Sequence, residues 1–201
     1  MIGKGPTART LRLDLKRFTL IGATTRLSLL SAPLRDRFGV TYHLDFYHPS
    51  EMQDILRRSS QLLAIPSEED ALHLIAHRSR RTPRIGNRLL KRVRDYAQVK
   101  SDGTLRLELV DEALRSLEID TCGLDESDRR TLRALIEKFN GGPVGLSSIA
   151  AAIAEEVETV EEVVEPFLLQ EVLIARTPRG RIATDAAYAH LGYPLPQRQT
   201  T

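Results

Sequence analysis

The sequence predicts a mixed fold, in which a short α/β segment is followed by an all-α bundle and then by three helices and a β-hairpin. Two observations predict this order. Apolar runs of strand length occur near the two ends of the chain. Between them, apolar residues recur at the three- and four-residue spacing that buries one face of a helix. We therefore expect three modules, at 1–47, 48–119 and 121–201.

The bulk composition is typical of a soluble globular protein. The chain has 201 residues, of which 41% are hydrophobic and 28% are charged, enough for one large domain or two to three small ones. No apolar run approaches the length of a membrane span, and no secretory leader is recognisable. Cys122 is the single cysteine, which excludes an internal disulfide and favours a reducing compartment. We expect a cytoplasmic protein.

Charge is distributed unevenly along the chain. Residues 1–120 hold 21 Lys and Arg against 15 Asp and Glu, whereas residues 121–201 hold 8 against 12. Eight basic and no acidic side chains lie within 78–94, and seven glutamates and no basic side chain lie within 155–171. The split suggests modules with different electrostatic roles, although solvated helix faces explain most charge runs.

The first module, 1–47, reads as part of an α/β domain. The run "FTLIGAT" at 18–24 is typical of a buried parallel strand, and "VTYHLDF" at 40–46 predicts a second strand. The loop "PLRDRFG" at 33–39 separates them and presents two arginines two residues apart. Two strands cannot make a domain, so we expect this module to begin in mid-fold or to depend on partners.

The second module, 48–119, should be a bundle of four helices. Ser50 is expected to open the first helix with a capping box, and Ser67 should cap the second. Thr82 followed by proline predicts the start of the third helix, whose apolar residues lie on one face. The run "KSDG" ends it, and a last helix is expected at about 108–118.

The third module, 121–201, has the pattern of a winged helix. Asp125 is a predicted N-cap, and further helices and short strands are expected at 146–156, 159–170, 172–176 and 181–184. Three helices followed by a hairpin is the winged-helix plan, a variant of the helix-turn-helix.

The predicted hairpin tip is the best candidate for contact with nucleic acid. The run "RTPRGR" places Arg176, Arg179 and Arg181 around a turn, where three guanidinium groups can bind phosphates. The alternative is a solvated polar turn. The third helix carries three glutamates, Glu161, Glu162 and Glu165. Phosphates would repel that helix, so we expect the wing to contact DNA.

Other stretches carry weaker signals. Arg84 lies in the first turn of a predicted helix, where it can reach an approaching anion; an exposed basic helix is an equally good reading. "HLIAH" at 73–77 lacks the glutamate and third ligand of a zinc site, and "LELVDEA" at 107–113 favours a helix over an acidic metal-binding strand. No Gly-x4-Gly-Lys-Ser/Thr motif occurs, and no Ser/His/Asp or Cys/His arrangement is recognisable. We expect no metal site.

Together these stretches resemble the RuvB family of bacterial ATPases. "FTLIGATTR", "LRDRFG", "TPRIGNRLLKRVRD", "KFNGGPVGL" and "RTPRGRIAT" occur in this order and spacing in that family, and the resemblance runs from Met1 to about Tyr193. It implies an α/β remnant of an AAA+ core, an all-α lid and a winged-helix head. It also implies a hexameric ring on duplex DNA that uses ATP and Mg²⁺ to drive branch migration of Holliday junctions, with RuvA as a partner and RuvC as a further one.

The resemblance also assigns roles to single residues. Thr25 resembles the sensor residue near the γ-phosphate, and Arg37 resembles the arginine finger that reaches the nucleotide of an adjacent subunit, assisted by Arg35. Tyr47 resembles a residue lining the nucleotide pocket, and Arg84 resembles the second sensor, on the lid. Arg176 and Arg181 resemble DNA contacts of the head. Residues 2–15 resemble the end of a hairpin that meets RuvA.

One departure from the family is large. The phosphate-loop lysine and the Mg²⁺ carboxylates of the family precede the part matched here, so we expect a C-terminal portion that cannot hydrolyse ATP by itself. Two other readings remain: a non-enzymatic DNA-binding or adaptor module, and another AAA+ protein such as a clamp-loader subunit. The missing phosphate loop favours the first, whereas "GGPVGL" followed by "RTPRGR" argues against the second.

Overall fold

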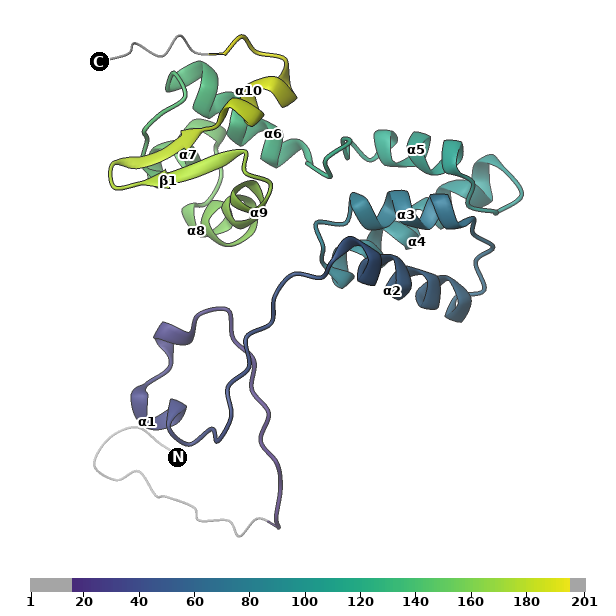
Figure 1. Cartoon of the computed structure of the whole chain (residues 1–201), viewed down its shortest axis with the longest axis horizontal. Helices are drawn as coiled ribbons and strands as arrows, with labels where there is room; N and C mark the ends of the chain where they lie inside the picture. The colour runs from purple at the N-terminus through teal and green to yellow at the C-terminus, as the bar shows by residue number, and fades with distance from the viewer. Residues whose placement is uncertain (1–15, 196–201) are drawn as a thin grey trace. The chain divides into compact units, whose positions relative to one another are not determined.

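The computed structural model describes residues 16–195 and divides into two compact units, one ending at Asp45 and one beginning at Phe46 (Figure 1). The second unit contains two hydrophobic cores, one formed by residues 52–114 and one by residues 124–188. We call these two parts the lid and the head. Within residues 16–195, no helix is both long and apolar enough to cross a membrane.

The first unit contains little regular structure in its described part, residues 16–45. A single 3₁₀ turn, η1 (Leu27–Leu29), precedes the short helix α1 (Ala32–Arg35). The prediction of strands at 18–24 and 40–46 is wrong, because neither segment pairs with another strand in this part of the chain. An apolar segment becomes a strand only when a neighbouring strand satisfies its backbone donors and acceptors, and a parallel sheet is also covered on both faces.

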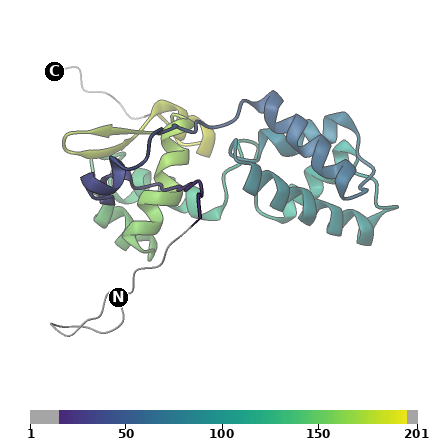
Figure 2. The same ribbon diagram turned by 90° about the horizontal axis from the view of Figure 1, so that it is seen from below.

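The lid is the predicted bundle of four helices. These are α2 (Pro49–Leu62), α3 (Glu69–His77), α4 (Pro83–Lys100) and α5 (Leu107–Ser116). They lie side by side in both views, with α2 packed on α3 and α4, and α5 closing the bundle against α3 and α4 (Figure 2). Met52, Leu72 and Leu90 are among the side chains at the fully buried centre. The helical interpretation of "LELVDEA" is confirmed, because this stretch lies in α5.

Two of the predicted caps in the lid are wrong. The ring of His48, and not Ser50, caps α2, and its capping box is completed by Glu51, whose Oε2 accepts the His48 backbone N–H at 2.7 Å. Glu68 takes the N-cap position of α3, because Ser67 is held in a β-bridge to Leu105. Proline at N1 pre-sets the backbone for helix, which moves the cap of α2 to the residue before Pro49.

The head has the predicted order of helices followed by a hairpin. Asp125 caps α6 (Glu126–Arg133) with a capping box, and a π-helical turn, η2 (Ala134–Lys138), continues it. Next come α7 (Leu146–Ile153) and a continuous third helix made of α8 (Val157–Thr159), the π-helical turn η3 (Val160–Val164) and α9 (Glu165–Gln170). The irregular turn lies directly before Pro166, where a helix is expected to be interrupted.

The wing is an antiparallel hairpin of β1 (Ile174–Thr177) and β2 (Gly180–Ala183), in which Arg176 pairs with Arg181. A further helix, α10 (Asp185–Leu191), follows and was not predicted. The loop "GGPVG" packs against the wing: Val144 exchanges backbone hydrogen bonds with Arg181. Gly142 has φ +92°, and a Cβ there would lie 2.3 Å from the Arg181 carbonyl oxygen. Only glycine fits that position.

Candidate functional site

The first unit presents the two arginines of "LRDRFG" on a tight turn after α1. Arg35 ends α1, and the backbone N–H of Arg37 donates to the Leu34 carbonyl at 3.2 Å. Both side chains are exposed, and neither has a partner among residues 16–195. The Phe38 ring lies over Gly22, where an added Cβ would be 3.3 Å from it. This contact joins the turn to the segment that leads to Thr25, which is also exposed.

The lid holds Tyr47 beside the start of the helix that carries Arg84. The backbone N–H of Tyr47 donates to the Arg81 carbonyl at 3.3 Å, and α4 begins two residues later at Pro83. Arg84 is the second residue of this 18-residue helix, is exposed, and has no partner in the described chain. A guanidinium beside a helix N-terminus suits an anion, because the first backbone N–H groups point the same way.

In the wing, two of the three predicted arginines are already bound to a buried glutamate. Glu165 on α9 is 1% exposed, and its Oε1 accepts from Arg176 Nε at 2.8 Å and from Arg181 Nε at 2.7 Å. Burial opposes the ionisation of Glu165, but the hydrogen bonds from the two arginines outweigh it and hold its pKa below the ordinary value. Glu165, one of the three glutamates of the third helix, thus binds the wing arginines directly.

The third wing arginine is different. Arg179 lies in the turn between β1 and β2, is exposed, and has no partner among the described residues. Beside the hairpin is a small cavity of about 170 Å³ lined by wing residues and one residue of the third helix, namely Glu161, Arg176, Thr177, Gly180 and Arg181. The wing thus has one unpaired guanidinium at its tip, that of Arg179. The other two, those of Arg176 and Arg181, are oriented by Glu165.

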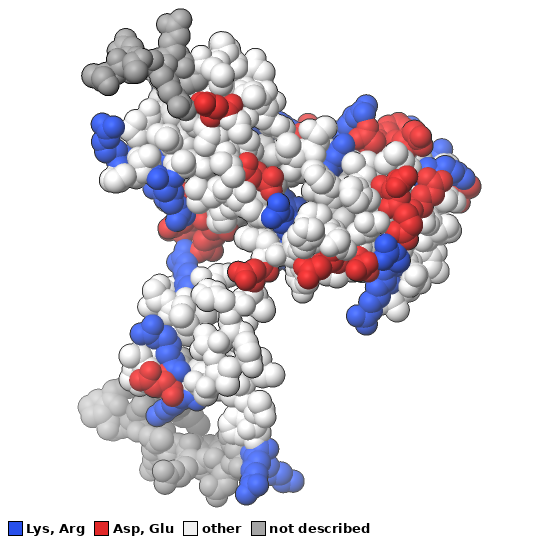
Figure 3. Space-filling model, in the orientation of Figure 1, with Lys and Arg blue, Asp and Glu red and all other residues white. Residues whose placement is uncertain are grey.

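One face of the lid carries charge of both signs. On the face drawn in Figure 3, Lys and Arg side chains alternate with Asp and Glu over the lid helices. Ion pairs such as Arg57–Glu69 and Arg106–Asp102, both 2.7 Å, account for part of this mixture. Within the basic run at 78–94, Arg78 and Arg94 are likewise paired with carboxylates, whereas Arg84 has no partner among the described residues.

A cysteine, a histidine and an aspartate meet where the linker after α5 reaches α10. His190 Nε2 lies 2.8 Å from Asp120 Oδ2, and its Nδ1 lies 3.5 Å from Cys122 Sγ. No Cys/His arrangement was recognisable in the sequence, because Cys122 and His190 are 68 residues apart; the fold brings them together. Burial, with the Asp120 charge second, raises the pKa of the Cys122 thiol. The thiol is therefore protonated at neutral pH and is not an activated nucleophile.

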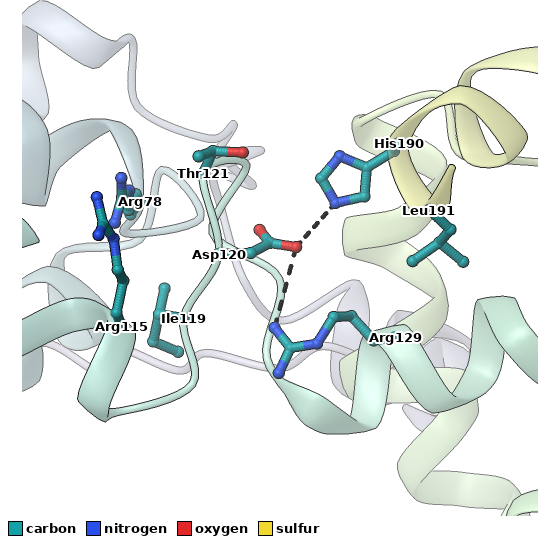
Figure 4. Close-up of a pocket in the computed structure, with 8 residues that line it drawn as sticks. All are labelled: Arg78, Arg115, Ile119, Asp120, Thr121, Arg129, His190 and Leu191. Carbon is teal, nitrogen blue, oxygen red and sulfur yellow. Dashed lines mark hydrogen bonds and ion pairs between the residues drawn. The ribbon is translucent and has the colours of Figure 1, made fainter. Parts of the chain in front are cut away.

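The cavity beside this cluster measures about 420 Å³ (Figure 4). Its arginines are paired with carboxylates: Arg78 with Asp111 at 2.7 Å, Arg129 with Glu126 at 3.1 Å, and Arg115 in direct contact with Asp111. Within residues 16–195, no group of three His, Cys, Asp or Glu side chains is placed to hold a metal ion. The charged side chains around this cavity thus bind one another, which is typical of a structural junction.

Three family models match consecutive parts of the chain. The RuvB P-loop domain matches residues 1–44, the RuvB AAA lid domain residues 47–120, and the RuvB C-terminal winged helix domain residues 121–192. The chain belongs to the RuvB family. The lid and winged-helix parts of this family correspond to the lid and head described above.

Known RuvB proteins are similar over nearly the whole chain. The Holliday junction branch migration complex subunit RuvB of Chloroflexus aurantiacus is 59% identical over 98% of this chain and 57% of its own length. The RuvB of Dehalococcoides mccartyi is 58% identical over 96% of this chain and 56% of its own length. The structure of Thermotoga maritima RuvB, titled a Holliday junction branch migration motor, matches with a TM-score of 0.79 and 49% identity, over 84% of this chain and 57% of that one. The structure of a variant of the Thermotoga protein matches with a TM-score of 0.85, over 91% of this chain and 61% of that one. This chain spans about 57% of the length of the RuvB relatives from Chloroflexus.

Proposed function

We propose that this chain supplies the lid, the DNA-binding head and the arginine finger of a RuvB-type motor, which drives branch migration of Holliday junctions in recombination and repair. The observation that carries the proposal is the wing. Arg179 is exposed at its tip, and Arg176 and Arg181 are oriented by the buried Glu165. Each of the two arginines keeps guanidinium N–H groups that Glu165 does not bind, and these can donate to phosphate oxygens.

The lid contributes the nucleotide contacts in this proposal. Arg84, in the first turn of α4, would bind a phosphate, and Tyr47 is hydrogen-bonded to Arg81, three residues before it. These groups fit the lid side of an ATP site. They do not fit a complete Mg²⁺-ATP site, because no Gly-x4-Gly-Lys-Ser/Thr motif occurs in the 201 residues. When bound, ATP with Mg²⁺ supplies the phosphoryl group whose transfer drives the motor.

Arg37, with Arg35, acts on a nucleotide held by an adjacent subunit. Phosphoryl transfer builds negative charge on the γ-phosphate oxygens, and a guanidinium at that point raises the rate by about 10³–10⁵ in NTPases that use such a finger. The exposed turn that presents Arg37 suits delivery to a second subunit. Thr25, near the same turn, would sense the γ-phosphate.

The proposed partners follow from the same assignment. They are duplex DNA at a Holliday junction, further RuvB subunits in a hexameric ring, RuvA and, as a further partner, RuvC. The residues expected to meet RuvA, 2–15, lie outside the described part of the chain. A chromosomal substrate agrees with the expected cytoplasmic location.

The alternative is an adaptor that binds DNA without hydrolysing ATP. The absence of the phosphate-loop motif from these 201 residues favours it for the chain acting by itself. We accordingly propose that this chain has no ATPase activity of its own and takes part in hydrolysis only beside a subunit that holds the nucleotide.

Titration of a fluorescent 30-base-pair duplex with the whole chain tests the DNA assignment. We expect binding that weakens steeply with salt, with log K falling by about 0.9 per log unit of salt for each phosphate contact. A chain that fails to bind the duplex at low salt would overturn the assignment of the wing.

A further inference from the structure

Arg80 belongs to the loop between α3 and α4 of the lid, yet its side chain is buried in the head. The side chain is 9% exposed, and its Nη2 is 2.6 Å from Asp125 Oδ2 and in direct contact with Asp128 Oδ2. Its guanidinium carbon lies 4.6 Å from the centre of the Phe167 ring, and its Nε donates to the Gly123 carbonyl at 3.4 Å. One lid side chain therefore contacts the first helix, the third helix and the linker of the head.

The receiving site is built for this one cation. Asp128 is fully buried, occupies the N3 position of α6, and also accepts the Asp125 backbone N–H at 2.9 Å. A buried carboxylate is costly unless it is paired, and removing one partner of a buried ion pair leaves an uncompensated charge. The planar guanidinium contacts two carboxylates, a carbonyl and a ring together, which a lysine ammonium cannot do.

The backbone of the loop is strained around this contact. Arg80 and Arg81 have φ of +54° and +51°, a conformation that non-glycine residues avoid. Strain of this kind persists only where the surrounding contacts determine the conformation. The same loop leads directly to the predicted nucleotide contacts, because the Arg81 carbonyl holds Tyr47 and α4 carries Arg84.

We propose that Arg80 is a positioning residue that fixes the α3–α4 loop of the lid to the head, so that the two domains move as one body. Domains joined by a short linker move relative to each other unless an interface holds them. The linker itself is held by Arg129 and His190, but these contacts do not reach the α3–α4 loop. The consequence for nucleotide sensing rests on the proposed function: a shift at Arg84 would reach the wing as a rotation of the whole body.

The distance distribution between two spin labels, measured by pulsed electron spin resonance on the whole chain, tests the coupling without nucleotide or DNA. Labels are placed on cysteines introduced at the exposed positions Arg58 in α2 and Ser147 in α7, with Cys122→Ala to remove the native thiol. Measurement at pH 8 keeps Asp128 ionised, because burial raises its pKa to about 7. Arg80→Met removes the charge and the guanidinium donors but keeps an unbranched, largely apolar stem.

We expect the distribution to be narrow in the parent and to widen at least about twofold in Arg80→Met, because lid and head have separate hydrophobic cores and neither core joins the two domains. Arg57→Met is the matched control: Arg57 pairs with Asp54 and Glu69 inside the lid, so its loss should leave the width unchanged. An Arg80→Met distribution as narrow as that of the parent overturns the proposal.

A second variant covers the case in which Arg80→Met fails to fold, as judged by far-ultraviolet circular dichroism. Asp125→Ser removes one carboxylate partner of Arg80 from a half-exposed position and retains a good N-cap for α6. Its distribution should be wider than that of the parent. A folded Asp125→Ser chain with unchanged width would then reject the coupling. The two proposals fail separately: a chain that does not bind duplex DNA would reject the assignment of the wing, but it would not change the distance distribution between the labels.

Discussion

Glu165 Oε1 lies 2.7 Å from Arg181 Nε, and this carboxylate is 1% exposed although it stands on the helix expected to be repelled by DNA. The same oxygen accepts from Arg176. The acidic third helix and the basic wing are thus parts of one ion-pair cluster.

Glu165→Gln should destabilise the head by about 1.5–3 kcal/mol, the usual value of hydrogen bonds to charged groups. The pKa of Glu165 is depressed in the folded chain, so its contribution is complete above the unfolded pKa of about 4.3 and is lost as the pH falls further. Urea unfolding at pH 7 and at pH 3.5 measures both effects. The exposed Glu161→Gln is the control and should change stability by less than about 0.5 kcal/mol.

Arg179→Glu should weaken duplex binding and reduce the salt slope by about one phosphate contact. Arg179 is a cleaner target than Arg181, since reversing the charge of Arg181 would place two carboxylates together beside a buried site. Fluorescence anisotropy with the whole chain is the measurement. Arg58→Glu, the same charge change on the exposed face of the lid, should have a smaller effect. Glu161→Gln should not weaken binding; weaker binding by that variant would place the third helix on the DNA.

Asp128→Asn should remove a pH dependence of stability. Burial raises the pKa of Asp128 to about 7 against the attraction of Arg80, so between about pH 4 and pH 7 the folded state binds a proton that the unfolded state releases. The stability of the parent relative to the variant should therefore fall as the pH rises, by at most about 1.4 kcal/mol per pH unit. Denaturation at pH 4.5, 5.5 and 6.5 checks the slope. A difference that grows with pH contradicts the sign.

Gly142→Ala should destabilise the head by more than about 1 kcal/mol, because a Cβ at φ +92° meets the Arg181 carbonyl at 2.3 Å. Gly145 is the matched control: it has φ −72°, and an added Cβ there would meet no other atom within 4 Å. Gly145→Ala should change the thermal midpoint little. Equal losses in the two variants would show that the loop is not held against the wing.

The sequence predicted the elements that depend on local pattern. The lid helices follow the spacing of Met52, Leu72, Leu90 and similar core residues, and the hairpin follows its turn. Helix α10 was missed although Thr184 and Gly192 mark its ends, with the Thr184 side chain accepting from Ala187 and Gly192 in the left-handed region. The strands of the first unit were predicted wrongly because a strand depends on its neighbours.

Contacts between distant residues could not be predicted. Arg80 and Asp128 are separated by 48 residues, and nothing in "RSRRTPR" distinguishes Arg80 from the arginines around it. In the sequence, Glu165 could not be distinguished from its neighbours Glu161 and Glu162. Its side chain meets Arg181 after a π-helical turn, which shifts the helix face and was not predicted. Roles of Thr25, Arg35, Arg37, Tyr47 and Arg84 remain predictions based on resemblance.

The most direct test of the central claim uses a mixed assembly. The Chloroflexus aurantiacus RuvB relative, with the arginine aligned to Arg37 replaced by alanine, is assembled on duplex DNA with this chain, and ATP turnover is measured. Co-assembly is verified by sedimentation. We expect this chain to restore turnover and its Arg37→Ala variant, assembled equally well, to leave the assembly inactive. Equal turnover with both forms would contradict the assignment of Arg37 as a finger acting on an adjacent subunit.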